Sequence, residues 1–217
     1  MEITVMKNIF GANAEKADEL RDILKEKKVL MVNVIGSPGA GKTTILEKTI
    51  ESLQKKGFNV AVIEGDVATD RDAVRLQKYE IPITLINTDG ACHLEALSIE
   101  QSLKGFDLEK LDFIFIENVG NLVCPAEFDI GEQHKVAVIS VTEGDDKPAK
   151  YPLLIHEASV MLVNKVDLMP YTNFNRDSFM KDVTQLNGTM DIYEMAATSD
   201  PEMTDWIGWL ESKLKSL

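Results

Sequence analysis

Residues 36–43, with the sequence GSPGAGKT, have the spacing of a phosphate-binding loop, G-x-x-x-x-G-K-[ST], between an apolar run and a helical pattern. Glycines let backbone N–H groups turn toward phosphate oxygens, and the following helix adds positive charge from its N-terminus. Lys42 would neutralise the β- and γ-phosphates, and the Thr43 hydroxyl would bind Mg²⁺. The predicted nucleotide-binding residues here are Gly36, Ser37, Pro38, Gly39, Ala40, Gly41, Lys42, Thr43 and Thr44.

A second motif, Asn164-Lys165-Val166-Asp167, follows the apolar run SVMLV and matches the NKxD pattern that reads guanine. The Asp167 carboxylate would accept hydrogen bonds from the guanine ring N–H and amino group, whereas adenine would leave it unpaired. The stem of Lys165 would pack over the ring. The alternative is a surface turn. The segment containing Ala197 could supply the loop behind the base.

Two acidic segments end predicted strands beside the phosphate loop: Glu64-Gly65-Asp66 and Glu117-Asn118-Val119-Gly120. Carboxylates at this place commonly hold Mg²⁺ or its waters and sense the γ-phosphate, although acidic residues also simply end strands. We therefore expect Asp66 and Glu117 to share the Mg²⁺ site with Thr43, with Glu64 a weaker candidate. The predicted catalytic residues are Lys42, Thr43, Asp66 and Glu117. No glutamine follows Gly120 to orient water, so slow unaided hydrolysis is expected.

The sequence has two cysteines and three histidines, and Cys92, His93 and Cys124 flank the acidic segments. Thiolate and imidazole ligands suit Zn²⁺ or Ni²⁺. Three ligands do not complete a tetrahedron, so a water or a second subunit would supply the rest. The alternative is that both thiols are buried small apolar groups.

Apolar runs alternate with helical patterns along the chain, which predicts an α/β fold with a doubly wound, mostly parallel sheet and helices on both faces. The whole chain, residues 1–217, is expected to form one P-loop NTPase domain, with residues 1–28 as an N-terminal helical extension. The expected strands are 30–35, 59–64, 82–87, 112–116, 135–141, 159–163 and 191–196. The expected helices are 13–27, 42–56, 71–79, 93–104, 174–186 and 201–215, and Cys92-His93 would begin the helix at 93–104.

The bulk composition is that of an ordinary globular protein, with 44% hydrophobic and 27% charged residues. The formal net charge of −13 argues against nucleic acid as a partner, because an acidic surface repels phosphate backbones. We find no apolar stretch long enough to span a membrane and no secretory signal, so no membrane association is expected and the expected location is cytoplasmic.

The order of GSPGAGKTT, EGDVATDRDA, ACHLEA, ENVGNLVCPAEFDIGE and NKVDL resembles the HypB family, GTPases that assist nickel insertion into [NiFe]-hydrogenase. This resemblance covers residues 30–200. It implies GTP, GDP and Mg²⁺ as cofactors and slow hydrolysis of GTP to GDP and phosphate. It also implies Ni²⁺ or Zn²⁺ at Cys92, His93 and Cys124, at the interface of a homodimer promoted by GTP and metal. The implied partners are the hydrogenase large subunit and a companion nickel chaperone.

The sequence departs from some members of that family. Leu97 and Gln101 stand where some archaeal members have histidines, and the N-terminus has no Cys-rich or His-rich tract. The resemblance therefore does not extend to a second metal per interface or to nickel storage.

Other functions remain open from the sequence. A related GTPase chaperone for urease or a cobalamin enzyme shares the phosphate loop. A small-molecule kinase would need an acceptor pocket and an arginine-rich lid, and NKVD argues against it. A metal store without enzymatic activity would need many more cysteines or histidines.

Overall fold

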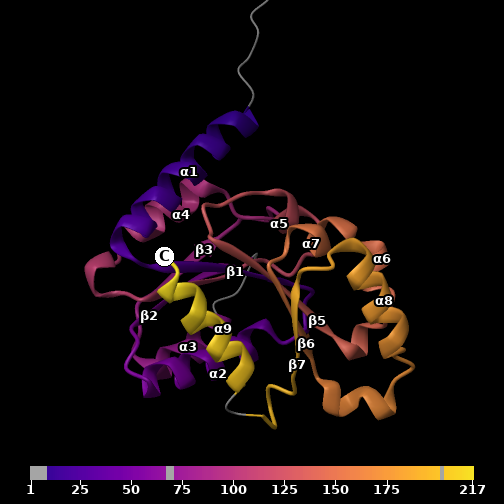
Figure 1. The fold of residues 1–217 in the computed structure, drawn as a ribbon. Helices are drawn as coiled ribbons and strands as arrows, with labels where there is room; N and C mark the ends of the chain where they lie inside the picture. The colour runs from indigo at the N-terminus through magenta and orange to yellow at the C-terminus, as the bar shows by residue number, and fades with distance from the viewer. Residues whose placement is uncertain (1–8, 67–70, 201–202) are drawn as a thin grey trace, which may run out of the picture.

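The computed structural model describes residues 9–66, 71–200 and 203–217. Its centre is a seven-stranded sheet in the order β3-β2-β4-β1-β5-β6-β7, and every recorded strand pair is parallel (Figure 1). The strands are β1 Leu30–Gly36, β2 Val60–Asp66, β3 Ile83–Asn87, β4 Phe113–Glu117, β5 His134–Ser140, β6 Val160–Asn164 and β7 Asp191–Glu194. The predicted doubly wound α/β fold is confirmed, and each predicted strand lies within two residues of its expected bounds.

Helices cover both faces of this sheet (Figure 1). The α-helices are α1 Ile9–Lys27, α2 Lys42–Lys55, α3 Arg71–Leu76, α4 Ala96–Leu103, α5 Cys124–Glu127, α6 Lys147–Lys150, α7 Pro152–Glu157, α8 Arg176–Leu186 and α9 Thr204–Lys215. Short 3₁₀ helices are η1 Gln77–Tyr79, η2 Leu108–Lys110, η3 Val141–Glu143 and η4 Val166–Tyr171.

Strand β1 is buried along its whole length, and its side chains alternate between the two faces. Val32 and Val34 belong to a core cluster with α2 and α9 on one side. Met31 packs with α1 and α4 on the other side, and Ile35 packs with α7 and α8. A strand with two buried faces must be apolar nearly throughout, which is why LMVNVI is a continuous apolar run broken only by Asn33.

Strand β1 lies between β4 and β5. The chain places β2, β3 and β4 on one side of β1 and then β5, β6 and β7 on the other side. In open parallel sheets this switch point leaves a crevice beyond the carboxyl ends of the strands. The phosphate-loop sequence follows β1 directly, and Glu117 ends the neighbouring strand β4.

The predicted helix at 93–104 is wrong at its start, because α4 begins at Ala96 and leaves Cys92 and His93 in the preceding loop. The reason is a tertiary contact. Asn13 of α1 accepts a hydrogen bond of 2.9 Å from the Ala96 backbone N–H through its side-chain oxygen, and Glu95 before it is extended. This contact satisfies one of the N–H groups that every helix start leaves free, and it fixes where α4 begins.

Three other predicted helices differ from the structure. The expected helix at 71–79 is α3 followed by the 3₁₀ turn η1, and α9 begins at Thr204, since residues 201–202 lie outside the described part. The N-terminal helix starts by Ile9, whereas 13 was expected. The sequence analysis missed α5, α6 and α7, each of which has proline in its first turn, a position that suits a helix start.

Candidate functional site

A cavity of about 540 Å³ opens at the carboxyl edge of the sheet and brings the predicted nucleotide-binding segments together. The phosphate loop, both acidic strand ends and the NKxD loop all contribute to it. Its lining residues are Pro38, Gly39, Gly41, Lys42, Thr43, Thr44, Glu64, Gly65, Asp72, Arg75, Glu117, Asn118, Gly120 and Lys165. Asp72 and Arg75 of α3 were missed as site residues, although Asp72 lies in EGDVATDRDA, which served only for the family resemblance.

The phosphate loop turns into α2 at Gly41, whose φ of 103° lies in the left-handed region. A Cβ atom there would also collide with the side-chain nitrogen of Asn164, so the position requires glycine. Lys42, the first residue of α2, is buried, and its Nζ donates to the carbonyl oxygens of Gly36 at 3.2 Å and Ser37 at 3.4 Å. The ammonium group therefore already lies inside the loop that would surround the phosphates.

Three side chains at the other wall of the cavity have the chemistry of a magnesium site. The Thr43 hydroxyl donates to Glu117 Oε1 at 2.9 Å, and Glu64 is paired in register with Glu117 on the neighbouring strand. Glu117 Oε2 and Glu64 Oε1 are buried and have no hydrogen-bond partner within the described chain. Burial raises the pKa of both carboxyl groups, and the Glu117 charge raises that of Glu64 further.

Buried carboxylate oxygens without a partner, next to a threonine hydroxyl, are the hard oxygen ligands that Mg²⁺ prefers. The residues present therefore fit the ion. The backbone of Asp66 ends β2 in register with Asn87. The side chain of Asp66 lies outside the described residues, so its role stays a prediction.

Asn164 of the NKxD motif connects the base loop to the phosphate loop. Its amide nitrogen donates to the Ala40 carbonyl at 2.9 Å, and its amide oxygen accepts from the Ala197 N–H at 3.2 Å. Both halves of the buried side chain are thus occupied by backbone groups. The sequence predicted Asn164 and Ala197 as nucleotide-binding residues. In the structure, Asn164 joins its own loop to the phosphate loop at Ala40 and to the loop that contains Ala197.

The other two residues of this motif remain available to a ligand. Lys165 has a positive φ of 61°, and its Nζ donates to the Gly39 carbonyl at 2.7 Å, so its stem crosses the mouth of the phosphate loop. Asp167 is exposed in η4. An exposed carboxylate next to a lysine stem is what reading of a guanine base requires.

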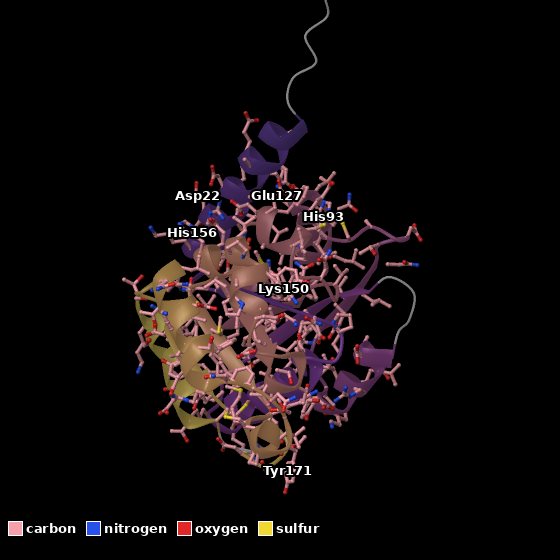
Figure 2. The ribbon with its side chains drawn as sticks, turned by 90° about the vertical axis from the view of Figure 1, so that its right-hand side faces the viewer. Asp22, His93, Glu127, Lys150, His156 and Tyr171 are labelled. Atoms are coloured by element: carbon pink, nitrogen blue, oxygen red, sulfur yellow. The ribbon has the colours of Figure 1, made fainter. Side chains whose placement is uncertain are left out.

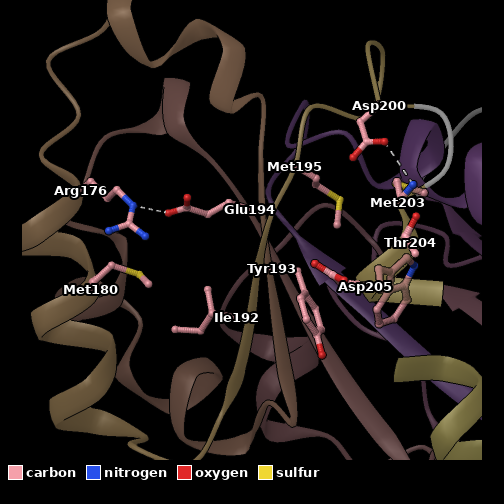
Figure 3. A pocket seen from close by; sticks show the side chains of 11 residues that line it. Arg176, Met180, Ile192, Tyr193, Glu194, Met195, Asp200, Met203, Thr204 and Asp205 are labelled. Atoms are coloured by element: carbon pink, nitrogen blue, oxygen red, sulfur yellow. Dashed lines mark hydrogen bonds and ion pairs between the residues drawn. The ribbon is translucent and has the colours of Figure 1, made fainter. Parts of the chain in front are cut away.

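A different cavity, of about 400 Å³, straddles the edge strand β7 between α8 and α9 (Figure 3). On one side of β7, Arg176 donates to Glu194 at 2.6 Å. On the other side, Tyr193 and Asp205 face the cavity near Asp200 (Figure 3). None of the predicted nucleotide or metal residues lines it.

Cys92, His93 and Cys124 form a compact group whose potential ligand atoms all lie within 4.8 Å of one another. The two Sγ atoms are 2.8 Å apart, and Cys92 Sγ lies 3.6 Å from His93 Nδ1. The hydrogen bond with Cys124 raises the pKa of the exposed Cys92 thiol. Figure 2 shows His93 near α1, at the opposite end of the molecule from Tyr171. The structure therefore brings together three residues that are up to 32 positions apart in the sequence.

Two further residues shape this group and were missed by the sequence analysis. The ring of Phe128 stacks on His93 with a centroid distance of 3.5 Å. Asn121 donates to the Cys92 carbonyl at 3.3 Å and accepts from the Val123 N–H at 2.9 Å. Cys124 begins the short helix α5, with Pro125 after it. Nothing in the spacing of these residues indicates the stacking partner, because the contact depends on the tertiary fold.

The model of the CobW/HypB/UreG nucleotide-binding domain matches residues 30–194. The hydrogenase maturation factor HypB of Escherichia coli K12 is 44% identical over 206 residues, which cover 95% of this chain and 71% of the relative. HypB of Helicobacter pylori, solved in complex with nickel, superposes with a TM-score of 0.87 at 36% identity, covering 94% of this chain and 96% of that one.

HypB from Archaeoglobus fulgidus gives the same TM-score of 0.87 at 34% identity, covering 94% of this chain and 99% of that one. In the described part of the chain, no helix is both long and apolar enough to cross a membrane. Because the family model matches most of the chain and these relatives cover nearly all of it, the chain belongs to the HypB branch of the CobW/HypB/UreG family.

Proposed function

We propose that this protein is a GTP-hydrolysing metallochaperone that assists nickel insertion during [NiFe]-hydrogenase maturation, with a Cys/His metal site coupled to nucleotide-dependent dimerisation. The observation that carries this proposal is the short connection between the two candidate sites. Glu117 contacts Thr43 in the nucleotide cavity, and Cys124, seven residues later (124 − 117), lies in the metal group. The nickel complex of the H. pylori relative supports the choice of metal.

GTP is the substrate in the first half of this function. Lys42 would neutralise its phosphates, Asp167 would read the base, and Lys165 would cover it. Mg²⁺, held by Thr43 and Glu117 with Asp66, would neutralise charge that develops on the phosphates. Water attacks the γ-phosphorus, and the bond to the β-phosphate oxygen breaks. This step should be slow in the isolated protein because Asn121, which stands where a water-orienting side chain is often found, is occupied by the Cys92 loop.

Ni²⁺ or Zn²⁺ is the cargo in the second half. Cys92, His93 and Cys124 offer three ligands, one short of a closed tetrahedral site. Two copies related by a two-fold axis would offer four thiolates and two imidazoles, enough for a closed site. Leu97 and Val123, both 53% exposed, flank the group and would be covered in such a dimer.

The partners follow from the family and stay part of the proposal. They are the hydrogenase large subunit, which would receive the metal, and a companion nickel chaperone. We place the protein in the cytoplasm, because the proposed metal site needs Cys92 and Cys124 as thiolates and a reducing compartment keeps thiols from forming a disulfide.

Sedimentation of the purified protein tests this proposal, with GDP or a nonhydrolysable GTP analogue, each with and without Zn²⁺ or Ni²⁺. We expect the dimer fraction to be largest with both the GTP analogue and metal. Cys92→Ala and Cys124→Ala should lose the metal effect and still bind GTP, whereas Lys42→Ala should lose the nucleotide effect. His156→Ala, which removes an exposed histidine on α7, is the matched control and should behave like the unmodified protein. An equal dimer fraction in all four conditions would contradict the coupling.

A further inference from the structure

A buried chain of three polar side chains crosses the apolar core next to the metal group. Asn118 Nδ2 donates to Asn33 Oδ1 at 3.0 Å, and Asn33 Nδ2 donates to Glu132 Oε1 at 3.0 Å. Asn33, Asn118 and Glu132 are 0%, 1% and 5% exposed. Polar groups this deeply buried are retained only when hydrogen bonds compensate for lost water, so the three positions depend on one another.

Each end of this relay, defined as Asn118, Asn33 and Glu132, also holds a backbone group. Asn118 Oδ1 accepts from the Val119 N–H at 3.0 Å, where the chain leaves β4. Glu132 Oε2 accepts from the Ile130 N–H at 2.9 Å, where the chain approaches β5. Asn33 lies on the central strand β1. The relay therefore fixes both ends of segment 119–131 to one residue of the sheet.

Segment 119–131 carries or contacts every residue of the metal group. Cys124 belongs to it, Phe128 stacks on His93, and Asn121 holds the Cys92 carbonyl. At its start, Asn118 follows Glu117, which contacts Thr43 of the phosphate loop. A displacement of Glu117 and Asn118 would leave Asn33 Oδ1 buried without a donor, which is costly unless the rest of the relay rearranges with it. A displacement at Asn118 is therefore linked through Asn33 to Glu132, at the other end of the segment.

We propose that Asn33 and Glu132 are positioning residues that transmit the nucleotide state from Glu117 and Asn118 to segment 119–131 and so set the nucleotide dependence of metal binding. This inference rests on the proposed coupling of GTP and metal. It assigns a role to two buried residues that touch neither ligand.

The test compares Zn²⁺ affinity in the GDP and GTP-analogue states, measured by competition with a coloured chelator at fixed protein concentration. Couplings of this kind are typically about 5- to 150-fold. The double variant Asn33→Leu/Glu132→Leu replaces two of the three relay residues by apolar groups and keeps Asn118. In it, the ratio of Zn²⁺ affinities in the two nucleotide states should fall to within about twofold of one. Glu132→Gln keeps the volume but cannot accept both hydrogen bonds, so it tests the same idea if the double variant fails to fold.

Two control variants separate positioning from loss of stability. Arg21→Gln releases the same segment from α1, because Arg21 pairs with Asp129 at 2.7 Å. It also removes a 3.3 Å hydrogen bond to the Glu132 backbone carbonyl, but it leaves the side-chain hydrogen bonds of the relay in place. Thr49→Ala removes the buried hydrogen bond from Trp206 on the other face of the sheet. Both controls should keep the full ratio of Zn²⁺ affinities between the GDP state and the GTP-analogue state.

Amide hydrogen exchange of segment 119–131 in the metal-free protein gives a second readout. Exchange should differ between GDP and the GTP analogue in the unmodified protein, and Glu132→Gln should abolish the difference. Unchanged nucleotide dependence in both relay variants, or a segment that never responds to nucleotide, would overturn the inference. If exchange responds through the relay but Zn²⁺ affinity does not, the relay stands and the proposed coupling to metal fails.

Discussion

The Thr43 hydroxyl donates a 2.9 Å hydrogen bond to Glu117 Oε1, which joins the phosphate loop to the end of β4 across the floor of the nucleotide cavity. Glu64 lies in register beside Glu117, so two buried carboxyl groups share this floor. Like charges in a buried place destabilise each other, and a bound divalent cation would relieve them. Burial and then the Glu117 charge raise the pKa of Glu64 to about 10, so the nucleotide-free protein holds a proton on this pair that a bound divalent cation would displace.

Glu64→Gln should stabilise the nucleotide-free protein at pH 8 by about 1–3 kcal/mol, because burial and then the Glu117 charge raise the pKa of Glu64. A raised carboxyl pKa gives stability that is largest below the unfolded-state value and falls as pH rises toward the folded-state value. The stability gained by Glu64→Gln should therefore be smaller at pH 5 than at pH 8. Urea unfolding at the two pH values measures this difference. Glu51→Gln, on the outer surface of α2, should change stability by less than about 0.5 kcal/mol. A destabilised Glu64→Gln at pH 8 would contradict this explanation.

Asp167→Asn should weaken GTP binding at least about tenfold and improve binding of xanthosine triphosphate, whose carbonyl replaces the guanine amino group. Asp167 is exposed and Asn164 holds its loop in place, so the exchange should leave the fold intact. Titration with fluorescent nucleotides measures both affinities. Asp22→Asn, an exposed position on α1 labelled in Figure 2, is the control. Equal affinities of the unmodified protein for ATP and GTP would show that this loop does not select the base.

His134, at the start of β5, contacts two other parts of the fold. Its Nδ1 lies 2.9 Å from Oγ of Ser159, just before β6, and its ring contacts Trp209 of α9. Burial, and to a smaller extent the Lys213 charge, lowers the pKa of His134 to about 4. Stability from the neutral ring is complete above the unfolded-state pKa of about 6.5 and is lost as pH falls toward 4. The ring keeps some solvent contact, so we expect a loss of about 1 kcal/mol between pH 7.5 and 5.

His134→Gln should flatten this part of the stability profile, while His156→Gln, on the surface of α7, should leave the slope unchanged. Urea unfolding at pH 7.5, 6 and 5 measures how the stability of each protein depends on pH. An identical slope in all three proteins would assign the acid sensitivity to other groups.

Much of the architecture could be predicted because its signals are local. Apolar runs and the glycines of the phosphate loop define the strands and the cavity from sequence alone, as the match at β1 and α2 shows. The start of α4 could not be predicted, because Asn13, 83 residues away, supplies the contact that fixes it. Local periodicity carries no information about such a partner.

The candidate site likewise has residues that local sequence patterns predict and residues that only the tertiary fold brings together. Spacing predicted Lys42, Thr43 and Glu117, and the structure places all three at one cavity. The stacking of Phe128 on His93 and the relay through Asn33 depend on which strands are neighbours. Asn33 is a visible anomaly in the sequence, a polar residue in an apolar strand, and that signal could have pointed to a buried network.

Gly120 packs directly on the phosphate loop, and a Cβ atom there would lie 2.6 Å from Cγ of Pro38 and 3.1 Å from its backbone nitrogen. Because the proline ring is rigid, Gly120→Ala must push the segment after β4 away from the loop. We expect weaker GTP and GDP binding in a folded protein, measured by nucleotide titration and thermal unfolding. Gly208→Ala is the matched control, since nothing lies within 4 Å of its added methyl group in α9. That control should keep nucleotide affinity and gain about 0.5–1 kcal/mol of stability, because alanine favours a helix over glycine. Normal nucleotide affinity of Gly120→Ala would show that the contact between Gly120 and Pro38 is not needed for nucleotide binding.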